Sequence, residues 1–285
     1  MKPDSEICLR VAIHLAQLAD HGSIKDSWCP DDPEHTREAQ SGEQFIDLIA
    51  IAADDTMIAL EHTTIESYTR QLHDFRQIES LLRPLEGQLV GQLPTDRTYV
   101  LAVGMGAVAD KTLDPTEVQS SVAAWIIATA PTLPAGSPQS APLHQAYGEP
   151  PTVPVEIVLS ARAPYGPSGE DGRLLINRFG DSDAATMMNL RVERLRVALR
   201  MKLPKLLARA PARTVLVLED PDLAMSNIFD VWVALQRAAE GLALCDTIVV
   251  VETWTSPIIG TIVFDAGEWL EDLNSHSFPL PQLTT

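Results

Sequence analysis

The apolar positions of the chain follow two spacings, one typical of helices and one typical of strands. Apolar residues recur every three or four positions in long segments, which predicts amphipathic helices. The predicted helices span about residues 6–20, 65–90, 114–129, 184–208 and 221–241. Shorter apolar runs predict strands over about residues 45–53, 57–63, 97–103, 155–163, 173–179, 214–219, 247–252 and 258–264. Together these elements predict an α/β fold with a mixed central sheet flanked by helices.

Two neighbouring strand-length runs, residues 45–53 and 57–63, predict a β-hairpin because only residues 54–56 separate them. Neither run alternates cleanly between apolar and polar residues, so both faces of the hairpin are expected to be covered. The two runs nevertheless contain Asp47 and Glu61. These acids are the most informative feature of the sequence.

Asp47 and Glu61 are expected to meet across the hairpin. Side chains alternate between the two faces of a strand, so an odd-numbered loop, residues 53–55, places the two acids opposite each other on one face. A two-residue loop would separate them. Adjacent buried carboxylates cost on the order of several kcal/mol each unless a cation, hydrogen-bond donors or a metal compensates. A Mg²⁺ site supplies that compensation.

A proline-rich segment at residues 131–154 predicts a linker or a long surface loop, because its seven prolines argue against regular structure. Residues 1–130, before this segment, are expected to form one α/β core. Residues 155–285, after it, begin with a second predicted hairpin. They continue with a β-α-β unit at 214–252, whose strands should be parallel. This part is expected to pack on the same sheet or to form a second small subdomain.

The charge of the chain restricts how it could bind nucleic acid. The sequence has 39 acidic residues against 21 lysines and arginines, a formal net charge of −18, so binding to a polyanion requires a local basic patch. The predicted helix at 184–208 provides a basic stripe beside an apolar sector. The stripe contains Arg191, Arg194, Lys202, Lys205 and Arg209, and the apolar sector contains Val192, Leu195, Leu199, Leu203 and Leu206. Alternatively, this face is solvated and its cations pair with acids elsewhere; Pro204 would kink or shorten the helix.

The cysteines and the first residues bear on where the protein resides. Cys8, Cys29 and Cys245 are far apart and lack CxxC spacing, which argues against a disulfide framework or a zinc module. Two acids in the first six residues argue against a signal peptide. No run approaches the roughly 18 apolar residues of a membrane helix. We therefore expect a soluble protein of the reducing cytoplasm that does not enter membranes.

The hairpin resembles the one that carries the active site in the PD-(D/E)XK, or restriction-endonuclease-like, nuclease superfamily. That family has an Asp on one strand and Glu-x-Lys on the next, and Ile46-Asp47 and Glu61-His62-Thr63 resemble these elements within about residues 43–66. The resemblance implies a nuclease-like core in the N-terminal half. It implies that Asp47 and Glu61 hold Mg²⁺ or Mn²⁺, and that the metal activates water for hydrolysis of DNA or RNA. The family often has a further acid on the preceding helix, for which Glu6 and Glu43 are candidates.

Thr63 departs from the family pattern, because a hydroxyl cannot supply the positive charge of the motif lysine. Members of the family sometimes supply this cation from a neighbouring helix, and the helix at 184–208 offers Lys202 and Lys205 as catalytic candidates. Two functions follow from the resemblance. The first is a metal-dependent nuclease. The second is a catalytically inactive relative that acts through protein contacts.

Other features of the sequence have simpler or competing interpretations. Asp47 or Glu61 could lie at a strand end in solvent while the other pairs with an arginine, and His62, on the opposite strand face, is interpreted as a core or interface residue. Glu219 and Glu252 follow strands at the edge where α/β sheets often bind ligands. Residues 104–109 match a dinucleotide-binding glycine pattern superficially, but the next helix is expected to start only near residue 114.

Overall fold

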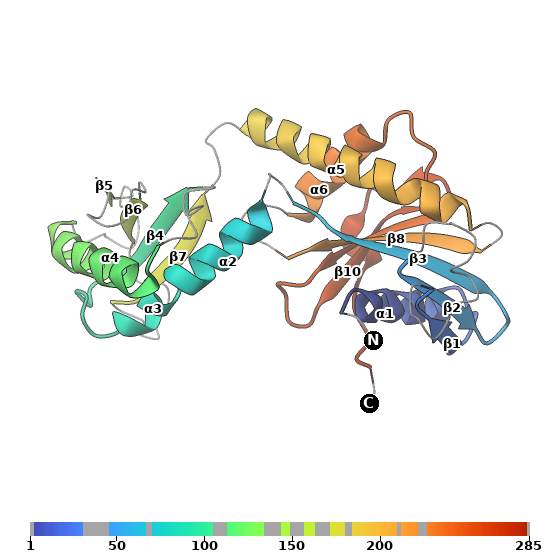
Figure 1. The fold of residues 1–285 in the computed structure, drawn as a ribbon, viewed down its shortest axis with the longest axis horizontal. Coiled ribbons are helices and arrows are strands. Elements are labelled where there is room, and N and C mark those ends of the chain that lie inside the picture. The colour runs from blue at the N-terminus through green and yellow to red at the C-terminus, as the bar shows by residue number, and fades with distance from the viewer. Residues whose placement is uncertain are drawn as a thin grey trace. The chain divides into compact units, whose positions relative to one another are not determined.

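The computed structural model describes residues 3–30, 46–66, 70–104, 113–133, 144–148, 157–162, 172–179, 184–209, 212–221 and 227–283. The chain forms two compact units, one from Met1–Ser67 with Met188–Thr285 and one from Tyr68–Met187 (Figure 1). The second unit is therefore an insertion in the first. This division differs from the boundary expected at residues 131–154, all of which fall within the second unit. A high proline content indicates irregular backbone, whereas the boundary of a compact unit lies where few residue contacts cross the chain.

The first unit contains a mixed sheet with helices on both faces. Its strands are β1 (Ile24–Trp28), β2 (Leu48–Ala52), β3 (Met57–Thr64), β8 (Arg213–Asp220), β9 (Thr247–Glu252), β10 (Ile259–Asp265), β11 (Glu268–Trp269) and β12 (Ser277–Pro279). They lie in the order β1-β2-β3-β8-β9-β10-β11, with β12 also paired to β10. β3, β8 and β9 run parallel, and the other pairs are antiparallel. The predicted mixed sheet flanked by helices is confirmed.

Two hydrophobic cores sandwich this sheet. Helix α1 (Pro3–Leu18) packs Val11 and Leu15 against one face, where they meet Leu60 of β3. Helices α5 (Ala184–Leu207) and α6 (Ile228–Ala239) cover the other face. The apolar sector predicted for α5 is confirmed, because Val192, Leu195, Leu199, Leu203 and Leu206 are all at most 8% exposed. Pro204 lies within α5, which continues to Leu207.

The β2–β3 hairpin has the odd-numbered loop that the sequence predicts. Leu48 pairs with Leu60 and Ile51 pairs with Met57. Beyond Ile51, the amide of Ala52 donates to the carbonyl of Thr56 at 2.9 Å, so three residues close the turn. The second of the two loop aspartates, Asp55, has a φ of 72°, in the left-handed region that Asp tolerates in turns. Continuing this register by one residue places Asp47 level with Glu61.

The second unit contains a smaller sheet covered by short helices. Its strands are β4 (Thr98–Gly104), β5 (His144–Gly148), β6 (Ile157–Arg162) and β7 (Leu174–Phe179), in the order β5-β6-β4-β7. Its helices are α2 (Gln71–Leu81), α3 (Pro84–Gln88) and α4 (Pro115–Thr129). The carboxylate of Asp114 caps α4 by accepting from the amides of Thr116 and Glu117, as the sequence predicts.

One prediction of strand pairing is wrong. The expected second hairpin does not form, because β4 lies between β6 and β7 and pairs with both. The predicted strand at 258–264 forms β10, which pairs with β9, β11 and β12. Apolar patterning identifies a strand but does not identify its partner. Strand β1 was not predicted at all, because Lys25, Asp26 and Ser27 interrupt its apolar pattern.

Two helix predictions also need correction. The segment predicted as one helix over residues 65–90 forms α2 and α3, because Pro84 cannot donate the backbone hydrogen bond that would continue α2. Helix α6 begins at Ile228 with Asn227 as its N-cap, not near residue 221. Asp220 is therefore the last residue of β8 and not a helix cap. Within the described ranges, no helix has both the length and the apolar character needed to cross a membrane.

The three cysteines should differ in reactivity. Cys8 and Cys245 are 0% and 3% exposed, and burial raises the pKa of Cys8 and raises that of Cys245 to about 12. Cys29 is partly exposed. Because the thiolate is the reacting form, iodoacetamide should modify only Cys29 in the native protein and all three in denaturant. Peptide mass spectrometry measures this directly. Rapid native labelling of Cys8 would contradict the packing of α1.

Candidate active site

Glu61 is a carboxylate buried within the sheet. It lies on β3, between β2 and β8, and is 1% exposed. Ala59 belongs to the core under α5 and α6, and side chains two residues apart on a strand share a face, so Glu61 also faces α5. The strand therefore delivers an acid into an otherwise apolar interior.

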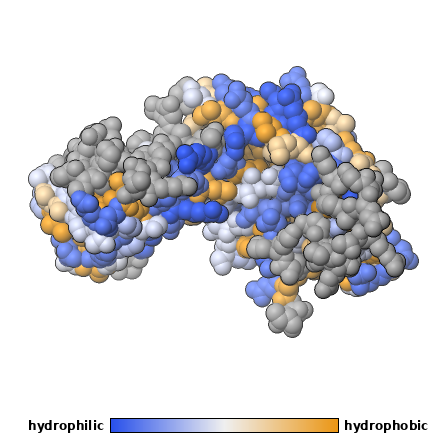
Figure 2. All heavy atoms as spheres, in the orientation of Figure 1, coloured by the Kyte–Doolittle hydropathy of each residue, from blue (hydrophilic) through white to orange (hydrophobic). Residues whose placement is uncertain are grey.

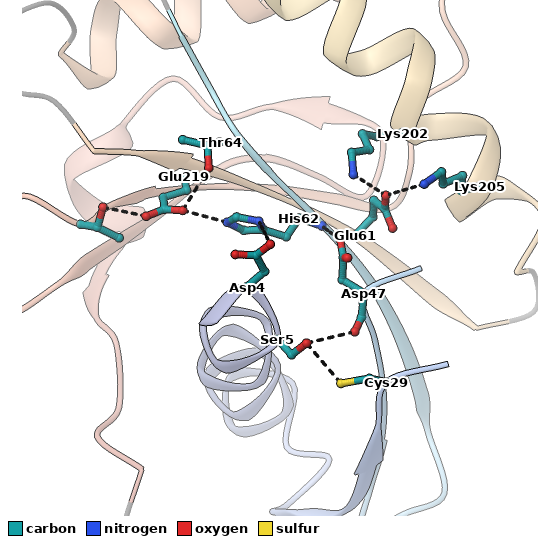
Figure 3. Close-up of polar contacts among 11 residues, drawn as sticks. Asp4, Ser5, Cys29, Asp47, Glu61, His62, Thr64, Lys202, Lys205 and Glu219 are labelled. Carbon is teal, nitrogen blue, oxygen red and sulfur yellow. Dashed lines mark hydrogen bonds and ion pairs between the residues drawn. The ribbon is translucent and has the colours of Figure 1, made fainter. Parts of the chain in front are cut away.

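Two lysines of α5 meet this acid. The ammonium nitrogens of Lys202 and Lys205 lie 2.6 and 3.2 Å from the same oxygen, Oε1 of Glu61 (Figure 3). Residues three apart on a helix project from one side, so a single helix face presents both amines. Glu61 Oε2 is buried and has no hydrogen-bond partner among the described residues. The carboxylate is thus bound by cations on one oxygen only.

Burial dominates the electrostatics of Glu61. Desolvation raises the pKa of its carboxyl, the hydrogen bond from Lys202 opposes that rise, and the negative charge of Asp47 adds to it. A buried polar atom without a partner costs about 1–3 kcal/mol, and more when it is charged. Oε2 therefore marks a position where a cation or a hydrogen-bond donor would be stabilising.

Asp47 lies immediately before β2 and is held against β3. Its carboxylate Oδ2 accepts from the backbone amide of His62 at 2.7 Å, and its own amide donates to the carbonyl of Leu60 at 3.1 Å. On the other side, its carbonyl accepts from the Ser5 hydroxyl of α1 at 3.4 Å, and Cys29 donates to that hydroxyl at 3.2 Å (Figure 3). The acid is therefore fixed beside Glu61 by contacts with two elements, β3 and α1.

A cavity of about 240 Å³ adjoins the two lysines. Residues 63–66 at the end of β3 form one wall, and the side of α5 from Arg194 to Lys202 forms the other. Thr63 and Lys202 therefore line the same space. Lys202 places an ammonium group across the cavity from Thr63.

The predicted basic stripe of α5 is not a continuous row of surface cations. Arg191 is only 5% exposed and lies 3.6 Å from Asp230, so it does not face solvent. Arg194 forms an ion pair with Glu66, and Lys202 and Lys205 contact Glu61. Arg209 lies two residues beyond Leu207, the end of the helix. The alternative weighed for this face, cations paired with acids, describes Arg191, Arg194, Lys202 and Lys205.

A second polar cluster lies on the opposite face of β3. His62, 4% exposed, contacts Glu219 through its Nε2 at 3.1 Å. Glu219 also accepts from the hydroxyls of Thr64 at 3.3 Å and Thr253 at 3.0 Å, and these bonds, with that of His62 the largest cause, lower the pKa of Glu219. His62 is thus buried on the face opposite Glu61, as the sequence predicts. Its partner was missed, because the sequence does not reveal that β3 lies beside β8.

The other sequence candidates do not join Glu61. Glu219 pairs in register with Val251, one residue before Glu252, so these two acids point to opposite faces and cannot form one site. Glu6 is exposed on α1. Glu43 and residues 105–109 of the glycine-rich pattern lie outside the described residues. Helix α4 begins at Pro115, as expected, and so does not start at these glycines.

The residues at this site suit a cation that needs few protein ligands. No group of three or more histidines, cysteines or acids that could hold a metal occurs among the described residues. Mg²⁺ commonly binds through one or two carboxylates, keeping waters and substrate phosphates as its other ligands. The unpartnered Oε2 of Glu61 and the carboxylate of Asp47 fit that requirement.

Comparisons of the chain with protein-family models, with curated proteins and with solved structures gave no match. The function of this site therefore has to be argued from its own residues. Two acids, two lysines and an adjoining cavity are the features that any proposal must explain.

The Glu219 cluster should make stability depend on pH. Its carboxyl pKa is lowered in the folded protein, so the stabilisation is present above the unfolded pKa of about 4.3 and is lost as pH falls through the folded pKa. Glu219→Gln should therefore lose less stability than the parent between about pH 5 and pH 3, and the two proteins should change alike between about pH 7 and pH 5. Urea unfolding at these three pH values measures this. Glu268→Gln, on the exposed β11, is the control and should behave like the parent.

Proposed function

We propose that the protein is a metal-dependent nuclease of the PD-(D/E)XK type. The observation that carries the proposal is Glu61, buried on the second strand of a hairpin with Lys202 and Lys205 bound to one oxygen and none of the described residues bound to the other. A carboxylate from each arm of a hairpin is a feature of that family, and some of its members supply the cation from a neighbouring helix. The restriction-endonuclease-like core would be the first unit, which is formed by Met1–Ser67 and Met188–Thr285.

Each residue of the site would have a separate role in the reaction. Asp47 and Glu61 would hold Mg²⁺ or Mn²⁺, and the bound metal would supply an activated water and stabilise charge on the scissile phosphate. Lys202, whose amine lies closest to Glu61, would place a positive charge beside the phosphate, as the motif lysine does elsewhere in the family. Lys205 would keep Glu61 ionised and oriented. Asp47 is already oriented by the amide of His62.

One observation favours the alternative of a catalytically inactive protein. Two ammonium groups already neutralise Glu61, so the carboxylate is compensated in part without a metal. Metal binding separates the two functions, because an ion bound to the folded state raises the melting temperature. An active site predicts a rise with Mn²⁺ that Glu61→Gln abolishes. An inactive relative predicts no rise in either protein.

Cleavage should depend on both acids. Asp47→Asn and Glu61→Gln keep the side-chain shape but remove a metal ligand, so each should lower Mg²⁺-dependent cleavage of DNA or RNA by about a hundredfold or more. Fluorescent oligonucleotides resolved on a denaturing gel measure the rate. Glu268→Gln again serves as the control and should retain full activity. Unchanged cleavage in both site variants would reject the assignment of Asp47 and Glu61.

A lysine at position 63 on β3 should partly replace Lys202 on α5 as the cation that the reaction needs. Lys202→Met should lower cleavage by about a hundredfold, as the loss of one charge-stabilising group does. Adding Thr63→Lys should restore at least tenfold, because residues 63 and 202 line the same cavity. The matched control is Thr63→Met with Lys202→Met, which adds a side chain of similar length without charge. Equal rates for the two double variants would show that Lys202 does not act as the missing motif lysine.

A further inference from the structure

The cavity adjoins the proposed catalytic site through Lys202. It has a volume of about 240 Å³ and is lined by Lys202, whose amine lies 2.6 Å from Glu61 Oε1. Thr63, two residues after Glu61 on the same face of β3, forms part of the opposite wall. A phosphate beside Lys202 and a group in this cavity would therefore be close enough to belong to one ligand, with no long spacer between them.

The α5 wall has a cation at each end and apolar residues between them. Lys202 lies at one end and Arg194, which pairs with Glu66, lies at the other, and the residues between are Leu195, Val197, Ala198 and Met201. Val197 and Met201 are 54% and 61% exposed, so apolar side chains interrupt the hydrophilic surface over α5 (Figure 2). A ligand with an anionic group beside Lys202 and a flat apolar group against the apolar residues of α5 would match this lining. A nucleotide has both groups, a phosphate and a base.

The size of the cavity limits what can enter. Pockets that enclose a drug-sized ligand occupy roughly 300–1,000 Å³, so this cavity accommodates one small ring system and excludes a base pair. A base within a continuous duplex is stacked and paired, and it reaches such a cavity only after it leaves the helix. An unpaired base enters without that cost and would contact the aliphatic side chains of Leu195, Val197 and Met201.

We propose that this cavity binds one unpaired nucleotide next to the scissile phosphate, so that the protein acts on single-stranded nucleic acid in preference to continuous duplex. The proposal rests on the proposed nuclease function and adds the substrate class. It agrees with a net charge of −18, which opposes the broad phosphate contacts on which duplex binding usually depends. Selection for a single strand arises from the shape of the cavity rather than from a basic surface.

The test fills the cavity and measures binding separately from cleavage. Anisotropy of a labelled single strand and of its blunt duplex gives the two dissociation constants at one low salt concentration, with Ca²⁺ in place of Mg²⁺ and gels confirming that the strands stay intact. The parent should bind the single strand at least tenfold more tightly. Ala198→Trp should weaken single-strand binding at least tenfold and leave duplex binding unchanged.

Ala208→Trp is the matched control, because Ala208 is exposed beyond the end of α5 and does not line the cavity. It should bind both nucleic acids like the parent. If Ala198→Trp does not fold, as judged by circular dichroism, Val197→Glu replaces it. Val197 is largely exposed, and the added acid should weaken single-strand binding at the rim of the cavity.

The outcomes separate the two proposals. Equal affinity of the parent for single strand and duplex, or a folded cavity variant that binds like the parent, would overturn the nucleotide site. Parent protein that prefers and binds a single strand but cleaves nothing with Mg²⁺ or Mn²⁺ would keep the nucleotide site and reject the nuclease. Cleavage of duplex and single strand at the same rate would reject the nucleotide site alone.

Discussion

The ion pairs between the buried Glu61 and two partly exposed lysines of α5 are the interaction on which the site depends. They join residues 141 and 144 positions apart in the sequence, across the whole inserted unit. A buried carboxylate without a cation would be strongly destabilising, so Glu61 requires the lysines. The first unit can form this site only when the chain before the insertion and the chain after it share one sheet.

Strand β3 carries polar side chains on both faces at its carboxyl end. Glu61 and Thr63 face α5, whereas His62 and Thr64 face Glu219 on the α1 side. On the His62 side, Glu219 accepts from His62, Thr64 and Thr253, and the bonds from His62 and Thr64 fix β3 against β8. The Glu61 side keeps an oxygen without a partner among the described residues. The hydrogen-bonded cluster around Glu219 thus holds β3 in place from one face, and the Glu61 carboxylate lies on the other face. This arrangement is suited to holding a reactive group in place.

Under the proposed function, the charge distribution favours binding of nucleic acid at one position on the protein over binding along an extended surface. The chain is strongly acidic, and most of the cations of the α5 stripe lie against acids. The positive charge near the site is concentrated at Lys202 and Lys205, beside a small cavity. Nucleic acid would then be bound through a phosphate and its adjoining nucleotide, with little help from long-range attraction.

The sequence by itself determined the local features: the odd-numbered turn that brings Asp47 level with Glu61, the Asp114 cap and the apolar sector of α5. Each depends on residues close together in the chain, so periodicity and turn length are sufficient to specify it. Only the tertiary structure decided that β3 lies beside β8, that β4 separates β6 from β7, and that Lys202 reaches Glu61 while Arg191 is buried. These outcomes depend on which distant segments pack together, and an apolar pattern shows that a face is buried without showing what buries it.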